Sequence, residues 1–127
     1  MEDDRRSELR SLVALAHVAS VPESIAFYRK LGFEVKNTFT PPEAKDPAWV
    51  WLEKGNARLM LSLASAPILP EEQAVLFYLY YDDIAATRRR LDEAGVTAGP
   101  IEHPFYNPRG EFRVTDPDGY VLMLTHT

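Results

Sequence analysis

Leu59-Met60-Leu61-Ser62 recurs 63 residues later as Leu122-Met123-Leu124-Thr125. The same spacing relates most of the chain, since Gly32 has its counterpart in Gly95 and Trp49 in Phe112. A fixed period within 127 residues indicates two copies of one supersecondary unit, each too small to bury a core alone. The repeat therefore predicts one domain built from two packed modules.

The composition is typical of a globular protein and limits the partners that we expect. Hydrophobic residues make up 46% of the sequence and the formal net charge is −5, which disfavours nucleic acid. The basic run Arg88-Arg89-Arg90 is expected to be a solvated helix face, because consecutive helical residues point about 100° apart. No apolar run is long enough for a signal peptide or a membrane span. We therefore expect a cytoplasmic protein that binds neither nucleic acid nor membrane. The absence of cysteine excludes disulfides and thiolate ligands.

Hydrophobic periodicity and turn residues predict the same order of elements in both halves. In the first half we expect a strand at 12–18, a helix from Pro22 to Gly32, and strands at 33–39, 49–53 and 57–63. In the second half we expect a strand at 74–81, a helix at 82–94 capped by Asp82, and strands at 97–101, 111–115 and 120–126. Each half is therefore predicted to be a βαβββ module.

These elements predict the domain organisation. Residues 1–11 form an N-terminal extension, and residues 12–127 form a single domain. The domain consists of modules 12–63 and 74–126, which the proline-bearing linker 64–73 joins. The last two strands are separated by Asp116-Pro117-Asp118-Gly119, in which proline and glycine stand where a turn requires them.

Two segments resemble the vicinal oxygen chelate superfamily, which includes glyoxalase I, bleomycin-resistance proteins, fosfomycin-resistance enzymes and extradiol dioxygenases. They are VPESIAFYRKLGF at 21–33 and FRVTDPDGY at 112–120. The resemblance spans about residues 12 to 126 and is closest in style to the metal-free bleomycin-resistance-like members. It implies an α+β fold in which two βαβββ modules form curled mixed sheets around an open cup, and it implies a homodimer. Both segments are scaffold motifs, so they indicate the fold rather than the reaction.

The loop 104–110 also resembles an aromatic and glycine-bearing segment of bleomycin-resistance proteins. Its side chains Phe105, Tyr106 and Arg109 are candidates for the rim of the cup or for a partner contact, because loops often carry binding residues.

Metal-dependent members of the superfamily place four His, Glu or Gln ligands on the inner surface of the cup. The resemblance puts these positions at Val13, Met60, Leu76 and Met123. The repeat supports this assignment, because Leu76 follows Val13 and Met123 follows Met60 by the same 63 residues. Valine and leucine have no ligand atom, and thioethers suit Cu(I) rather than Mg, Mn, Fe(II) or Zn. We therefore expect no metal site and no cofactor.

Strand alternation predicts which side chains line the cup. If the turn after Thr115 pairs it with Tyr120, Phe112 shares the face of Met123; a bulge there reverses the assignment. By the repeat, the two tryptophans then share the face of Met60. The predicted ligand-binding residues are His17, Trp49, Trp51, Arg58, Met60, Tyr78, Tyr80, Phe112 and Met123. Aromatic walls suit flat, partly apolar molecules, methionine adapts to irregular shapes, and Arg58 offers a charged fork to an anion.

The sequence favours a metal-independent protein that binds a small molecule and sequesters a hydrophobic or aromatic compound. Two alternatives stay open, because aromatic side chains in a small β-cup are more often core than ligand cage. One is an enzyme of the same family, of lyase, isomerase or dioxygenase type, that acts without the usual metal or with a displaced one. In it, His17 or a tyrosine would be the acid–base group. The other is a regulatory or interaction module whose cup is filled by its own side chains.

Overall fold

The computed structural model describes residues 7–127, so residues 1–6 of the predicted extension lie outside it. The first module consists of β1 (Ala14–Val18), α1 (Val21–Lys30), β2 (Glu34–Phe39), β3 (Trp49–Lys54) and β4 (Ala57–Leu63). The short 3₁₀ helix η2 (Pro70–Glu72) lies in the linker. The second module consists of β5 (Phe77–Tyr81), α2 (Ile84–Glu93), β6 (Glu111–Thr115) and β7 (Val121–His126).

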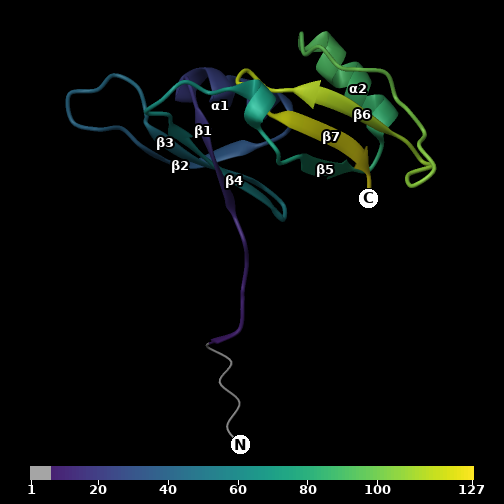
Figure 1. Cartoon of the computed structure of the whole chain (residues 1–127), viewed down its shortest axis with the longest axis horizontal. Coiled ribbons are helices and arrows are strands. Elements are labelled where there is room, and N and C mark those ends of the chain that lie inside the picture. Colours follow the sequence, from purple (N-terminus) through teal and green to yellow (C-terminus); the bar gives the residue numbers. More distant parts are fainter. Residues whose placement is uncertain (1–6) are drawn as a thin grey trace, which may run out of the picture.

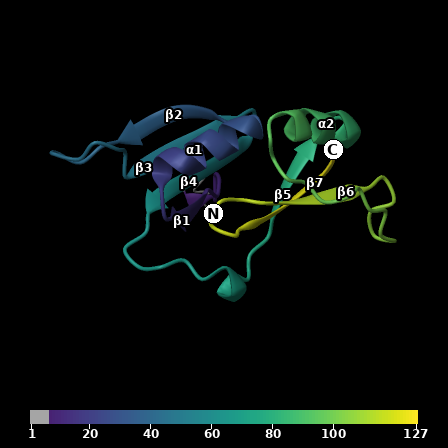
Figure 2. The ribbon, with the colours of Figure 1, turned by 90° about the horizontal axis from the view of Figure 1, so that it is seen from above.

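The strands form two open mixed sheets with the orders β1-β4-β3-β2 and β5-β7-β6. In each sheet the first strand of the module pairs in parallel with the last, and the other pairs are antiparallel. Both helices lie on the same side of the sheets (Figure 1), and α1 lies over the four-stranded sheet when the molecule is seen from above (Figure 2). The predicted α+β fold of two related modules with an open cup is confirmed.

Local sequence signals fix the ends of both helices. The Ser20 hydroxyl accepts the backbone N–H of Glu23 at 3.2 Å and caps α1. At α2 the capping residue is Asp83, which accepts the N–H of Ala86 at 3.1 Å, so the prediction of Asp82 as the cap is wrong by one residue. Gly95 follows α2 with a φ of 82°, a conformation that favours glycine.

The second module lacks the regular strand predicted at 97–101. Only two isolated bridges form there, Ala98 with Val114 and Glu102 with Glu111. The guanidinium of Arg88 donates to the carbonyls of Gly99 at 2.7 Å and Ala98 at 3.0 Å, so a side chain of α2 satisfies these acceptors in the absence of a regular strand. Arg88 is therefore a structural residue, and the prediction of a solvated face is wrong for this arginine.

One hydrophobic core lies between the helices and the sheets. Both modules contribute to it, with Tyr28, Leu52 and Leu61 from the first, and Leu91, Phe112 and Leu124 from the second. Residues 63 apart occupy equivalent places in both helices, since Ser24 and Thr87 are both buried. The repeat thus corresponds to a real structural equivalence of the helices and of the last strands.

The two segments that carry the family resemblance meet at the joint between the modules. The Tyr28 hydroxyl of α1 donates to the Asp116 carboxylate in the turn before β7 at 2.7 Å, and both residues are buried. The backbone N–H of Ala19 donates to Asp118 at 2.9 Å, and the Tyr81 hydroxyl donates to the Leu31 carbonyl at 2.7 Å. These contacts join α1 and the residues next to its two ends to the second module.

The joint predicts a loss of stability in alkaline solution. Burial raises the pKa of Tyr81 to about 12 and also raises the pKa of Tyr28. Unfolded tyrosines ionise near pH 10, about where the unperturbed phenol titrates. The stability that these protonated phenols contribute is therefore complete below about pH 10 and is lost as the pH rises through about 12. Urea unfolding at about pH 9 and about pH 11 should show a smaller alkaline loss in Tyr81→Phe than in wild type. Equal losses of stability in the two proteins would contradict this role of the Tyr81 phenol.

Neither helix of residues 7–127 has the length and apolar character of a membrane span. The cytoplasmic location stays a prediction.

Candidate functional site

The face of the four-stranded sheet that points away from α1 carries the cup residues predicted for the first module. Two rows cross this face: His17, Ser62 and Trp49 in one, and Leu15, Met60 and Trp51 in the next. The intervening residues Ala16 and Val18 are buried, which places these rows on the opposite face. Both tryptophans and Met60 are half-buried, whereas His17 is exposed. The tryptophans therefore share the face of Met60 as predicted.

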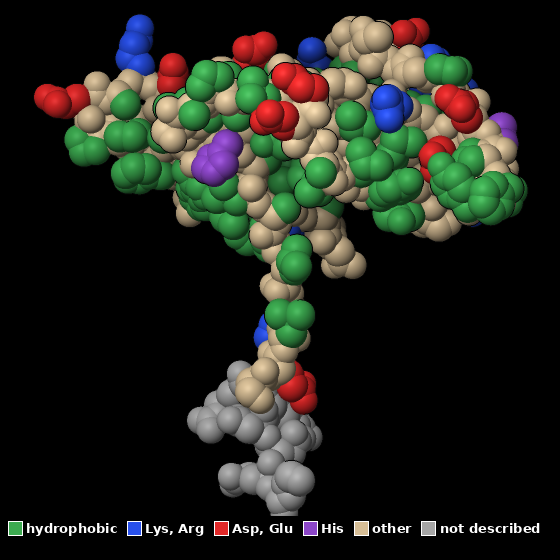
Figure 3. Space-filling view, in the orientation of Figure 1, with side chains coloured by type: hydrophobic (Ala, Val, Ile, Leu, Met, Phe, Trp, Pro, Cys, Tyr) green, Lys and Arg blue, Asp and Glu red, His purple; other side chains and the backbone are tan. Residues whose placement is uncertain are grey.

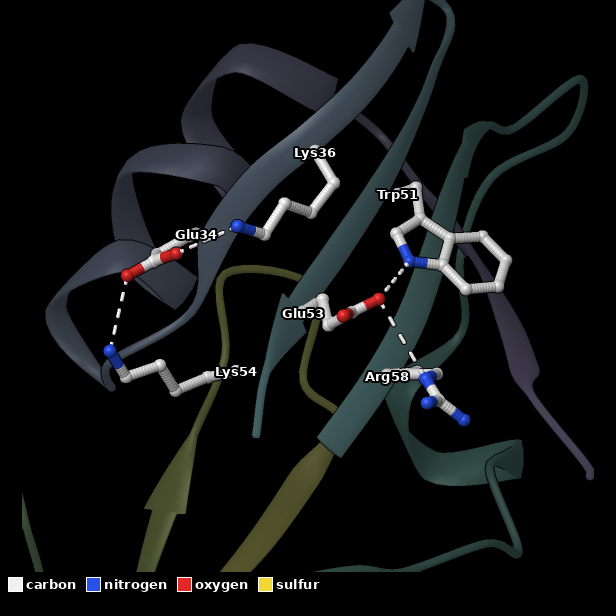
Figure 4. A network of polar contacts seen from close by, with 6 residues as sticks. All are labelled: Glu34, Lys36, Trp51, Glu53, Lys54 and Arg58. Carbon is white, nitrogen blue, oxygen red and sulfur yellow. Dashed lines mark hydrogen bonds and ion pairs between the residues drawn. The ribbon is translucent and has the colours of Figure 1, made fainter. Parts of the chain in front are cut away.

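A third row on this face is polar (Figure 4). The indole N–H of Trp51 donates to the Glu53 carboxylate at 2.9 Å, and the same oxygen lies 3.7 Å from Nε of Arg58. Arg58 is thus balanced by an acidic neighbour rather than left free for an anion. Arg58 and the indole N–H of Trp51 thus approach the same carboxylate oxygen.

In the second module the hairpin register differs from the predicted one. Thr115 lies opposite Val121 rather than Tyr120, and Phe112 lies opposite Leu124. Because successive strand residues point to opposite faces, this shift of one residue moves Phe112 from the cup to the core, where it is 1% exposed. The prediction that Phe112 lines the cup is therefore wrong. The turn explains the shift, since the N–H of Asp116 donates to the Tyr120 carbonyl at 2.9 Å and leaves a loop of three residues, 117–119, instead of the predicted four.

The corrected register puts different side chains on the cup face of β6. Glu111 lies beside Thr125, and Arg113 lies beside Met123. Across the same sheet, Tyr80 pairs with Thr125 and Tyr78 with Met123. The second half of the cup is therefore more polar than predicted. A correct register would have found Glu111 and Arg113 from strand alternation alone.

A groove of about 930 Å³ runs between the modules. Its lining includes Leu12, Phe33, Arg58, Leu76, Tyr78 and Tyr80. The two tyrosines are 42% and 62% exposed, with ring centroids 6.5 Å apart. Apolar side chains also group on the side of the molecule away from the helices (Figure 3). Of the predicted residues, Arg58, Tyr78 and Tyr80 meet in this groove, while the tryptophans, Met60 and His17 lie on the adjoining sheet face.

A second hollow of about 360 Å³ adjoins the groove, since Tyr78 and Tyr80 line both. Its other walls are Tyr106, Asn107, Glu111, Thr125 and His126. The loop 104–110 thus contributes Tyr106 to the cup rim, as expected from the sequence. Arg109 instead donates to the Thr127 carbonyl at 3.1 Å.

The family follows from a match over most of the sequence. Residues 12–124 match the Glyoxalase/Bleomycin resistance protein/Dioxygenase superfamily. The chain belongs to this superfamily. No curated protein matches the chain significantly in sequence.

Solved structures of the superfamily share the fold at low identity. A bleomycin-binding protein in complex with bleomycin is 20% identical, with a TM-score of 0.71 over 94% of this chain and 99% of its own. The antibiotic-binding protein TnmS3 from Streptomyces sp. CB03234 is 22% identical, with a TM-score of 0.68 over 94% and 97%. A glyoxalase family protein from Enterococcus faecalis is 22% identical, with a TM-score of 0.70 over 93% and 96%.

The four positions at which the sequence resemblance predicts metal ligands carry apolar side chains. Met60 and Met123 lie within β4 and β7, while Val13 and Leu76 lie just before β1 and β5. Within residues 7–127, no group of three or more His, Cys, Asp or Glu side chains is placed to hold a metal ion. The donor set therefore does not fit the hard or borderline cations of the metal-dependent members.

Proposed function

We propose that the protein binds and sequesters flat, partly apolar small molecules without a metal ion. The observation that carries this proposal is the open groove between the modules, whose volume of about 930 Å³ is that of a drug-sized ligand site. Exposed aromatic rings on its wall supply contact area and stacking. A bleomycin-binding protein and an antibiotic-binding protein that share the fold support the same class of activity.

The exposed rings also weigh against a cup that is filled by its own side chains. Tyr78 and Tyr80 are too exposed to serve as core, and the groove remains between them and Arg58. His17 is exposed on the sheet face, and the ion pairs of residues 7–127 give its ring no carboxylate partner. An orienting partner of that kind is what acid–base catalysis by histidine usually uses. The geometry therefore favours binding over turnover.

The proposal includes a homodimer. Apolar side chains that a single copy leaves exposed occur on the cup side and on residues 7–13 ahead of β1: Leu9, Leu12, Leu15, Leu76 and Phe39. Such exposed apolar groups indicate an interaction surface, and a second copy presents the same surface in return. Light scattering should give twice the 14.4 kDa of the chain. A monomer mass at working concentrations would remove this part of the proposal.

Tryptophan fluorescence tests the binding function directly. Trp49 and Trp51 are the chain's two tryptophans, and Trp51 is linked through Glu53 to Arg58 on the groove wall. Titration with a panel of planar aromatic antibiotics and metabolites should change their emission, equally before and after treatment with a chelator. Trp51→Phe should remove most of the signal while calorimetry still detects binding. Unchanged emission and no heat across the panel would support the filled module instead, and metal-dependent binding would refute metal independence.

A further inference from the structure

The smaller hollow contains a buried carboxylate without an opposite charge. Glu111 is 5% exposed, although glutamate is almost never buried unless it is paired. The ion pairs of residues 7–127 join Glu34 to Lys36 and Lys54, and Glu53 to Arg58. None of them includes Glu111.

Neutral groups hold this carboxylate in place. The Asn107 side-chain amide donates to Oε1 of Glu111 at 3.0 Å and to the hydroxyl oxygen of Thr125 at 2.7 Å. The Tyr106 hydroxyl donates to Oε2 at 3.2 Å, and the Thr125 hydroxyl donates to the Gly110 carbonyl at 3.0 Å. These bonds orient the carboxylate at the wall of the hollow and leave its charge uncompensated.

Tyrosine rings surround the same space. Tyr78 and Tyr80 are neighbours with an interplanar angle of 32°, and Tyr106 closes the hollow from the loop. The negative charge of Glu111 is the main reason why the pKa of the Tyr106 phenol is raised, and Tyr78 contributes to the same shift. The rings and the carboxylate are thus close enough to act on one bound group.

We propose that the Glu111 hollow binds an organic ammonium group between Tyr78, Tyr80 and Tyr106. A cation over aromatic faces is attracted by the ring quadrupole, and the ammonium group supplies the opposite charge that a buried carboxylate requires. A hard metal ion does not fit, because it needs several oxygen ligands that converge on one point. The inference rests on the proposed function, because it names the ligand class: an aromatic body in the groove with an ammonium group in the adjoining hollow.

Calorimetry with a matched pair of probes tests the charge. The amine 2-(naphthalen-1-yl)ethylamine and the alcohol 2-(naphthalen-1-yl)ethanol share an aromatic body and differ in the charged group. We expect wild-type protein to prefer the amine at least about tenfold, as the loss of one charge-assisted contact predicts. Glu111→Gln should abolish this preference and keep the affinity for the alcohol. Glu93→Gln on the exposed side of α2 removes the same charge far from the hollow and should keep the preference.

Two further measurements keep the test decisive. Tyr80→Leu changes an exposed ring, so it should fold even if Glu111→Gln does not, and it should weaken amine binding several-fold. Tetramethylammonium alone should shift the tyrosine ring signals of the wild-type NMR spectrum. Equal affinity for amine and alcohol would overturn the ammonium site and leave the proposed function intact. A response to tetramethylammonium without binding of either naphthyl compound would support the ammonium site and contradict the proposed function. No response to any probe would refute both the site and the function.

Discussion

Replacing Phe112 with alanine should lower the free energy of unfolding by about 3–5 kcal/mol, the usual cost of removing a buried phenyl ring. The ring is fully buried in the shared core beside Leu122 and Leu124. Its removal therefore leaves a cavity and takes away the packing contacts of the ring. Urea denaturation followed by circular dichroism measures the change. The slope of the unfolding free energy against urea concentration should be the same in both proteins.

The matched control is Phe105→Ala, which removes the same ring from a loop position that is 94% exposed. Its unfolding free energy should stay within about 0.5 kcal/mol of wild type. If Phe112→Ala were as mild as this control and weakened ligand binding instead, Phe112 would belong to the cup after all, and the hairpin register would be the one predicted from the sequence.

The second large effect is expected at Asp116, where alanine should cost about 3 kcal/mol or more. The carboxylate accepts the Tyr28 hydroxyl at 2.7 Å and the backbone N–H groups of Asp118 and Tyr120 at 2.8 and 2.9 Å. Removal leaves these donors without their acceptor, and each stranded buried donor costs about 1–3 kcal/mol.

Asp116→Asn is the matched conservative variant, because it has the same shape as aspartate. It keeps an acceptor for the backbone donors and has no charge to bury, and burial is the main reason why the pKa of Asp116 is raised. Most of the stability lost in the alanine variant should therefore return. In a double-mutant cycle, Tyr28→Phe and Asp116→Ala together should cost less than their sum. Strict additivity would contradict the direct hydrogen bond.

The sequence predicted the order of elements well, because the signals that determine it are local. The Pro22 to Gly32 helix and the Trp49 to Leu63 hairpin were placed to within a residue or two. The prediction of a strand at 97–101 was wrong because of a contact with a residue outside this segment. The carbonyls there are engaged by Arg88 from α2, and periodicity within a segment cannot indicate such a contact.

The candidate site was predicted less completely, because its composition depends on hairpin register. The two-residue turn between Lys54 and Ala57 left the tryptophans on the expected face. The longer turn between Thr115 and Val121 shifted the second hairpin by one residue relative to the repeat. This register shift of one residue placed Glu111 rather than Phe112 on the cup face. The β-strand propensities of these two residues do not indicate the shift.

The Tyr28–Asp116 hydrogen bond has a consequence for the history of the two modules. Each module supplies one half of a buried polar pair, and the position equivalent to Tyr28 in the second module is Leu91, which has no hydroxyl. The repeated halves have therefore become unequal and interdependent. Exchanging one module of this chain for that of a relative would leave one half of this pair without its partner, unless the incoming module supplied a matching group.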